Sequence, residues 1–229
     1  MAQELTDINK NNEMAFDGIV LPCSETTGIK CDFDNPTYGW KDLVGQIIPR
    51  SGGQAAPAFT AFRGGKVKEY AFSDTDIIDN ITFHMPHDYV LGSDMFIHIH
   101  WGHNGTAISG TFAGNMNIMY SKGYTQAGEI FEAETVIPWT ISTPDVTTFP
   151  RWAHNIHELQ MSASAGAGGL INTDKLEIDG LIVVQFETTT VPTITGSATS
   201  NLPYVFTIDI HYQSTETATK NRNYPFYGV

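Results

Sequence analysis

Alternation of apolar and polar residues with a period of two is the feature that most constrains this chain. It is clearest in residues 96–101, which follow a Gly-Ser-Asp segment typical of a turn. Successive side chains of a β-strand point to opposite faces, so the pattern predicts a strand with one face in a core. The expected inner face holds Ile97, Ile99 and Trp101, and the outer face holds Phe96, His98 and His100.

The same alternation recurs in short segments separated by Gly, Pro and Ser. It predicts an all-β chain of eight to ten strands, arranged as a jelly-roll-like β-sandwich with an extended N-terminal arm. The run 181–186 is continuously apolar and predicts a central strand buried on both sides. Segment 151–162 fits a strand or an amphipathic helix. The other predicted strands are 59–62, 67–72, 77–84, 96–101, 110–120, 129–139 and 204–212, with Phe206, Ile208, Ile210 and Tyr212 facing inward.

Composition divides the chain into three parts. Residues 1–38 contain few apolar residues and no period, which predicts an extended arm that takes its order from a partner. Residues 39–213 form the predicted sandwich, and residues 214–229 form a C-terminal docking tail. Aromatic residues in this tail predict contact with another surface: Tyr224, Phe226 and Tyr227.

Charge and cysteine content exclude several classes of protein. The net charge is −13, from 25 acidic and 12 basic residues. Phosphate contacts come mainly from Lys and Arg, so we expect no nucleic-acid partner. The sequence has no run of about 18 apolar residues and no basic, apolar leader, so we expect no membrane partner and synthesis in a cytoplasm. Cys23 and Cys31 are expected to be free thiols.

A metal site is the sharpest chemical hypothesis that the histidines raise. Residues 98–102, His-Ile-His-Trp-Gly, resemble the zinc-binding strand of α-class carbonic anhydrases, but the third histidine of that family has no counterpart here. A cupin-type site would need a carboxylate soon after the pair, and only His211 could be its distant ligand. We therefore expect no metal, no cofactor and no enzyme activity, with His98, His100 and His211 as weak candidates only.

Two further histidine clusters have spacings that argue against catalysis. His84-Met-Pro-His-Asp88 contains a proline and predicts a turn, and His154-Asn-Ile-His-Glu158 lacks the order and the helix of a zincin motif. Nucleophile elbows, Walker loops and dinucleotide-binding glycine motifs do not occur in the sequence.

Several stretches resemble structural proteins of tailed phages, especially podophages and marine or cyanobacterial phages. The most specific pair is Pro-His-Asp-Tyr-Val at 86–90 and His-Ile-His-Trp at 98–101, and the similarity runs over about residues 39–212. The resemblance implies a virion component on the capsid exterior, similar to decoration (cement) proteins that bind the major capsid protein. A tail or head-fibre module that binds a host glycan is the alternative, and a cupin-type metalloenzyme is the third reading.

Closed homo-oligomers are the usual state of such proteins, so we expect a homotrimer. The outer face of strand 96–101 is rich in rings, and a contact with other copies of the chain or with the shell would explain this composition. The predicted contact residues are Trp40, Phe96, His98, His100 and His103, together with Tyr224, Phe226 and Tyr227.

Overall fold

The chain divides into two compact units, Met1–Tyr38 and Gly39–Val229. In the first unit, β1 (Met14–Phe16) and β2 (Ile19–Leu21) pair as an antiparallel hairpin, where the sequence predicted no regular structure. The rest of the predicted arm, both cysteines and nearly all of the predicted tail lie outside the described residues. The computed structural model describes residues 14–16, 19–21, 38–49, 55–123 and 130–215.

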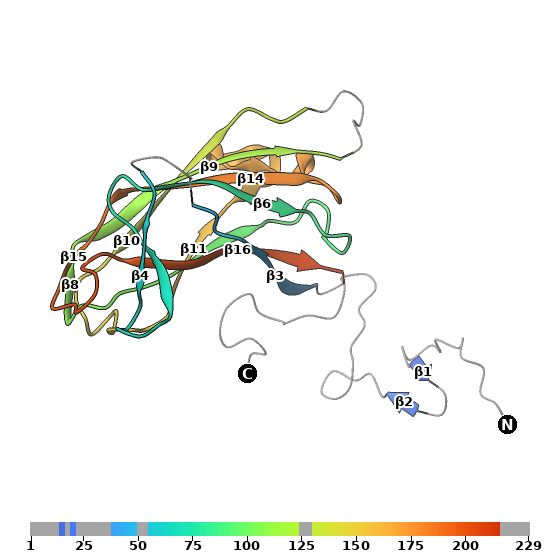
Figure 1. Cartoon of the computed structure of the whole chain (residues 1–229). Helices are drawn as coiled ribbons and strands as arrows, with labels where there is room; N and C mark the ends of the chain where they lie inside the picture. Colours follow the sequence, from blue (N-terminus) through green and yellow to red (C-terminus); the bar gives the residue numbers. More distant parts are fainter. Residues whose placement is uncertain (1–13, 17–18, 22–37, 50–54, 124–129, 216–229) are drawn as a thin grey trace. The chain divides into compact units, whose positions relative to one another are not determined.

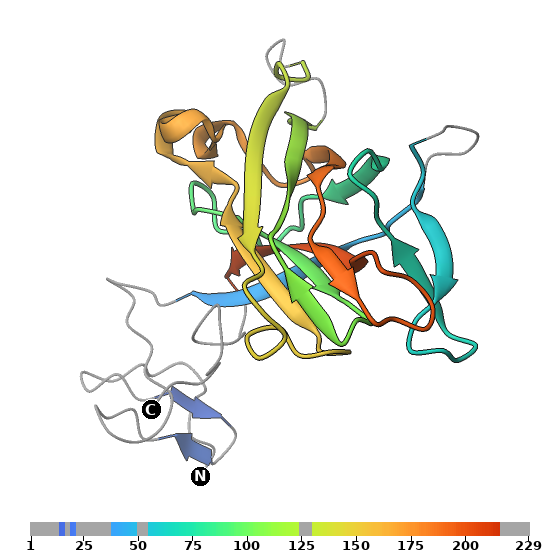
Figure 2. The same cartoon turned by 90° about the vertical axis from the view of Figure 1, so that its left-hand side faces the viewer.

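The second unit is a β-sandwich, which confirms the predicted fold class. One sheet has the order β10-β9-β14-β6, and the other has the order β11-β7-β16-β5-β4, with β3 also paired to β16. Figure 1 shows these two layers one above the other, and Figure 2 shows them after a turn of 90°. The strands are β3 Gly39–Gly45, β4 Ala58–Ala61, β5 Lys68–Ala71, β6 Ile77–His84, β7 Phe96–Gly102, β8 Ala107–Ser109, β9 Thr111–Ser121, β10 Thr135–Ser142, β11 Asn155–Gln160, β12 Ser162–Ala163, β13 Ile171–Asn172, β14 Leu181–Thr190, β15 Thr193–Thr195 and β16 Tyr204–Ser214, with 3-10 turns η2 Ser164–Gly169 and η3 Thr173–Lys175.

The strands are wound as a jelly roll. From β5 the chain crosses to β6 in the other sheet, returns to β7, crosses again to β9 and continues to β10 in the same sheet. It then returns to β11, crosses to β14 and ends in β16. The first strands of the unit therefore pair with the last ones, β3 and β5 with β16, and β6 with β14, as in a jelly roll.

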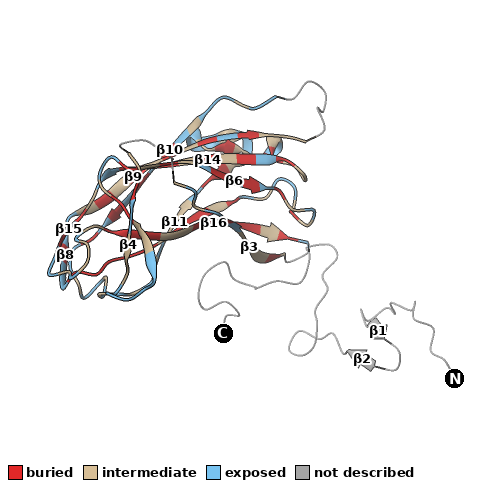
Figure 3. Cartoon of the chain, in the orientation of Figure 1, coloured by how far each residue is buried: buried red, intermediate tan, exposed pale blue. Residues whose placement is uncertain are grey.

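The core lies between the two sheets and is lined by alternate residues of each strand. The three apolar residues of β7 predicted to face inward are buried, as are Ile208, Ile210 and Tyr212 of β16. Burial alone does not alternate in these strands, because His98, Asp209 and His211 on the opposite face are buried as well. Figure 3 shows buried and exposed segments alternating along the strands. The largest fully buried side chains are Trp101, Tyr89, Tyr204, Phe72, Phe83, Phe112 and Phe186.

Two β-bulges account for errors in the predicted faces. One lies in β16 between Val205 and Thr207, so Phe206 turns to the outer face while Val205 enters the core. The other lies between β14 and β6: the alternation of 77–84 predicts that Ile77 and Asp79 share a face with Ile81, but the bulge places Ile78 inward with Ile81 instead. A bulge adds one residue to one strand only, and a periodic pattern does not reveal this.

Strand β14 also differs from its prediction. It is central, but its outer face is not covered: burial alternates along it, and Leu181 is 38% exposed. Strand β10 begins at Thr135, six residues later than predicted, whereas β11 resolves the ambiguous segment 151–162 as a strand. Among the described residues, no helix has the length and apolar character needed to cross a bilayer.

Candidate functional site

The outer face of the six-stranded sheet carries the histidines that the sequence singled out. Strand β16 lies between β7 and β3, with Asp209 opposite His98 on one side and His211 opposite Asp42 on the other. Strand β11 adds Glu158 opposite His98 on the far side of β7. Since the alternate residues of these strands enter the core, these side chains gather on the opposite face. We call the set the histidine–aspartate cluster: Asp42, His98, His100, His154, Glu158, Asp209 and His211.

His98 lies at the centre of this cluster and is only 3% exposed. Its Nε2 is 3.0 Å from Glu158 Oε2, a distance at which the N–H donates to the carboxylate. Its Nδ1 is 3.6 Å from Asp209 Oδ1 and has no hydrogen-bond partner. A neutral imidazole that donates through Nε2 carries a lone pair on Nδ1, so His98 presents an acceptor to Asp209.

His211 repeats this arrangement on β16. Its Nε2 pairs with Asp42 Oδ1 on β3, and its Nδ1 has no hydrogen-bond partner. The rings of His211 and His98 are tilted against each other, with centroids 3.8 Å apart. Each of these two imidazoles therefore uses Nε2 on a carboxylate and leaves a buried Nδ1 unpaired.

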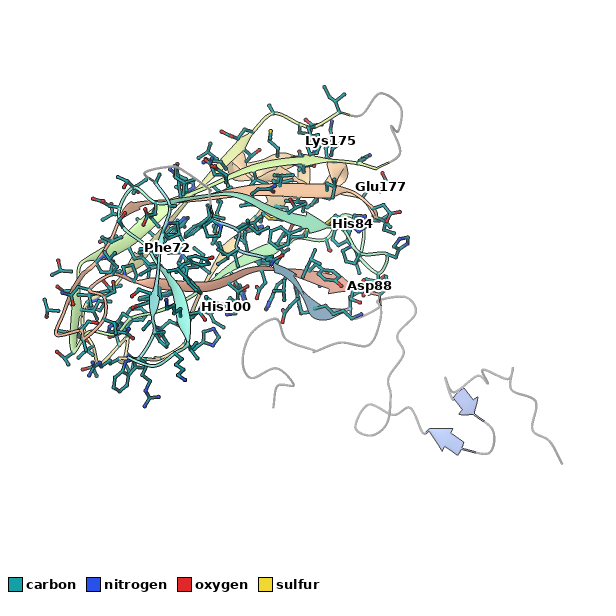
Figure 4. All side chains as sticks on the ribbon, in the orientation of Figure 1. Phe72, His84, Asp88, His100, Lys175 and Glu177 are labelled. Atoms are coloured by element: carbon teal, nitrogen blue, oxygen red, sulfur yellow. The ribbon has the colours of Figure 1, made fainter. Side chains whose placement is uncertain are left out.

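Asp209 joins the two halves of the cluster. Its Oδ2 lies 2.7 Å from His100 Nε2, while its Oδ1 has no hydrogen-bond partner. His100 Nδ1 in turn lies 2.7 Å from His154 Nε2, and the two rings stack with centroids 4.9 Å apart. Figure 4 labels His100 on the layer that contains β16. The alternation of strand 204–212 already placed Asp209 on an outer face, but nothing in the sequence connected it to the histidines of β7.

The surroundings favour the neutral form of His98 and of His154 and the ionised form of Asp42. Burial lowers the pKa of His98 below its ordinary value, and the hydrogen bond to Glu158 opposes this only in part. Burial and the neighbouring His100 lower the pKa of His154. The hydrogen bond from His211 holds the pKa of Asp42 below the usual value for an aspartate.

Three cluster residues have the geometry of a metal-ligand set. One ligand atom of each of His98, Asp209 and His211 lies within 4.8 Å of the other two, and all three residues are buried. Imidazole nitrogen and carboxylate oxygen are common ligands of divalent transition metals. Two of the three weak candidates from the sequence, His98 and His211, belong to this set. Its third member is Asp209, not the third candidate, His100.

The other predicted contact residues have different surroundings. Phe96 and Trp40 lie on the same outer face, with ring centroids 5.7 Å apart. His103 is fully buried, and its Nε2 is 2.8 Å from the carbonyl oxygen of Phe149, so its expected place on a contact surface was wrong. The alternation that predicted it ends with β7 at Gly102. The predicted contacts of Tyr224, Phe226 and Tyr227 lie outside the described residues.

The His84–Asp88 segment has a structural role, as its proline suggested. The Asp88 carboxylate accepts hydrogen bonds from Lys41 on β3 at 2.7 Å and from the Tyr212 hydroxyl on β16 at 3.1 Å. His84 and His87 both lie near Asp179, at 3.5 and 2.9 Å. Figure 4 shows Asp88 beside the ends of β3 and β16, where it ties the turn to the six-stranded sheet.

A small pocket of about 120 Å³ lies away from this cluster. The guanidinium groups of Arg63 and Arg151 lie 4.5 and 4.1 Å from the ring centroid of Trp152. Arg63 and Trp152 have positive φ angles of 56° and 66°, which are rare for large side chains. The lining residues are Arg63, Gly64, Asn104, Arg151, Trp152, Ala198 and Thr199.

Comparison with known proteins adds one likeness. No protein-family model and no curated protein matches the chain. Among solved structures, the chain is similar to a protein described as "xylan-binding module CBM15", with 11% sequence identity and a TM-score of 0.29. The match covers 83% of this chain and 97% of that module. Xylan binding is a property of that module.

Proposed function

We propose that this chain is a virion protein that binds the capsid shell as a decoration protein and has no catalytic role. The observation that supports this function best is that apolar side chains in and near the outermost strand of the six-stranded sheet are exposed. Ile48, Phe59 and Val67 are 55%, 55% and 67% exposed, in the segment after β3, in β4 and just before β5. Groups of exposed apolar residues often mark a surface that binds another molecule.

Strand β4 is the last strand of its sheet on this side, so its outer backbone groups have no strand partner among the described residues. An open edge with apolar side chains is a surface on which another chain can dock, including by strand addition. The net charge of −13 favours a partner that is more basic than this chain. The resemblance to tailed-phage structural proteins supplies the identity of that partner, the major capsid protein.

The proposed assembly is a homotrimer on the capsid exterior. His98 and His211 are buried, so the contact between copies is carried by apolar residues that flank the cluster. Val44 on β3 and Ile156 on β11 are 67% and 53% exposed and lie on the same outer face. Light scattering of the purified protein at micromolar concentration should give three times the chain mass, and a monomer would contradict this assembly.

Cosedimentation with capsids that lack the decoration protein tests shell binding. The wild-type chain should bind to saturation, whereas the double variant Phe59→Asp/Val67→Asp should bind at least about tenfold more weakly, since it places charges in an apolar contact. Met119→Asp is the matched control, because Met119 is an exposed apolar residue of the other sheet. Equal binding by the double variant and the wild type, or no binding by the wild type, would overturn the proposal.

The arginine pocket favours one alternative, a fibre module that binds an acidic host glycan. Two arginines that line one small pocket suit a carboxylate or sulfate group, and strained backbone is often found at binding sites. Trp139 on β10 is 2% exposed, so its ring is not open to stacking on a sugar. A glycan array should then show binding to acidic glycans that Arg63→Gln/Arg151→Gln abolishes and Lys66→Gln leaves intact.

A further inference from the structure

We propose that His98, Asp209 and His211 bind one divalent transition-metal ion, with Zn²⁺ the best fit, which fastens β7 to β16. The three atoms that would hold it are His98 Nδ1, Asp209 Oδ1 and His211 Nδ1. All three are buried, and none has a hydrogen-bond partner. This site is independent of the proposed shell contact, which lies on another part of the sheet.

The first argument is the chemistry of the three atoms. The Nε2 atoms of both histidines face carboxylates, Glu158 for His98 and Asp42 for His211. A neutral histidine that donates through Nε2 has only a lone pair on Nδ1, and a carboxylate oxygen is an acceptor only. Three acceptors thus converge with no donor between them, and unpaired buried acceptors cost free energy. A cation satisfies all three at once.

The second argument is distance. Ligand atoms bound at 2.0–2.2 Å to a tetrahedral ion lie about 3.3 Å from one another. His98 Nδ1 and Asp209 Oδ1 are 3.6 Å apart, and one ligand atom of each of the three residues lies within 4.8 Å of the other two. Closing the set on an ion therefore requires shifts of less than about 1 Å per ligand atom. Adjacent strands of one sheet supply such shifts through side-chain torsions alone.

The third argument is the outer set of partners. Metal-binding histidines commonly donate their second N–H to a carboxylate, which orients the ring and raises the basicity of the ligand nitrogen. Glu158 and Asp42 are placed in this way, one on each histidine. The second oxygen of Asp209 lies 2.7 Å from His100 Nε2, as an ion pair without the geometry of a hydrogen bond.

The choice of metal and of role follows from the ligands and their burial. Two imidazoles and one carboxylate suit Zn²⁺ better than Ca²⁺ or Mg²⁺, which prefer oxygen ligands. The three residues are 3%, 4% and 8% exposed and belong to two paired strands, and on this ground we assign the ion a structural role. Three protein ligands leave one tetrahedral position, which water would fill. The sequence predicted no metal because no third ligand follows His98 and His100 closely in the chain. Two of the three proposed ligands, Asp209 and His211, come instead from β16, which is far from β7 in the sequence.

Metal titration of the full chain tests the site. After treatment with a chelator and gel filtration, ZnCl₂ should bind at about one equivalent per chain and raise the melting temperature. CoCl₂ should give the visible absorption bands of a low-coordinate nitrogen and oxygen site, and Zn²⁺ should displace it. Asp209→Asn should lose this binding, while Glu158→Gln and Asp42→Asn should keep the stoichiometry with an affinity about 10- to 100-fold lower.

His87→Gln is the matched control, because His87 is an exposed histidine beside an aspartate on another part of the surface. Circular dichroism establishes whether each variant is folded. If Asp209→Asn does not fold, the proposal is tested by the zinc stoichiometry and cobalt spectrum of the wild-type chain and by the zinc affinity of Glu158→Gln. A wild-type chain without stoichiometric Zn²⁺ or Co²⁺ binding would overturn the proposal. So would binding that survives in folded Asp209→Asn or that is lost in His87→Gln.

Discussion

The two outer faces of the sandwich are built from the same alternating strands but differ in what they hold. On the six-stranded sheet, His98 and His211 are buried, each pairs with a carboxylate through Nε2, and Asp209 has a ligand atom within 4.8 Å of both. On the four-stranded sheet, the outer face carries a ladder of amides: Asn117 donates to Gln185 at 2.8 Å, and Gln185 donates to Asp79 at 3.1 Å. These groups are half-buried and keep access to water.

The difference shows where polar pairing matters to the fold. A buried ionised group that loses its partner is costly, whereas a solvated amide that loses one exchanges a hydrogen bond for water. The outer face of the six-stranded sheet should therefore be sensitive to substitution and to pH, and that of the four-stranded sheet should be tolerant. The following predictions test this contrast.

Removal of the central carboxylate should have the largest effect. Asp209→Ala removes a buried carboxylate and leaves His100 Nε2 without the oxygen that lies 2.7 Å from it, so we expect a loss of about 3–5 kcal/mol in the free energy of unfolding. Urea denaturation measures this free energy. Metal-free buffer ensures that the loss reflects the missing carboxylate and not the loss of a bound ion. A loss below about 1 kcal/mol would show that the network is not needed for stability.

The four-stranded sheet should be sensitive on its inner side. A Cβ at Gly114 on β9 would lie 1.8 Å from the backbone oxygen of Glu187 and 2.8 Å from the Trp139 ring. Gly114→Ala should therefore cost about 1–3 kcal/mol or more through overpacking. Thermal unfolding of this variant beside Gly110→Ala, where nothing lies closer than 3.9 Å to an added Cβ but φ is 101°, separates the effect of close packing from that of backbone strain.

Acid should weaken the fold through the histidines on or beside the six-stranded sheet. Burial lowers the pKa of His98, His154 and His157 in the folded chain, so the unfolded chain takes up protons first. Stability is then constant above pH about 6.5 and falls as the pH drops from there towards the lowered values, by about 1.4 kcal/mol for each unit of pKa shift. Melting temperatures from pH 8 to pH 5 measure this.

Two variants show which histidines cause the fall in stability. His98→Gln should flatten the dependence on pH, because it removes a group with a lowered pKa. His87→Gln should retain it, since His87 is exposed and lies beside Asp179. A chain whose melting temperature does not change between pH 8 and pH 5 would contradict the assignment.

The smallest effect is expected on the amide ladder. Asn117→Ala removes one hydrogen bond between half-buried amides, so the free energy of unfolding should fall by about 0.5–1 kcal/mol. Denaturant unfolding beside Asp209→Ala gives the contrast directly. A cost similar to that of Asp209→Ala would mean that both outer faces depend equally on pairing.

The sequence alone determined the fold class and the inner faces of most strands. Period-two alternation is a local property, since each residue of a strand faces the core or not according to its own position. It therefore placed Ile97, Ile99 and Trp101 in the core correctly. It failed where a bulge shifts the period, as at Phe206, and where a segment leaves the strand, as at His103.

Only the tertiary structure decided how the outward residues combine. His98 and Asp209 lie on strands that are far apart in the sequence and become neighbours because the jelly roll pairs β7 with β16. Local alternation showed that each residue faces outward, but it contains no information on strand order or register. Long-range pairing sets both, and it alone brings three buried acceptor atoms together at one point on the outer face of the sheet.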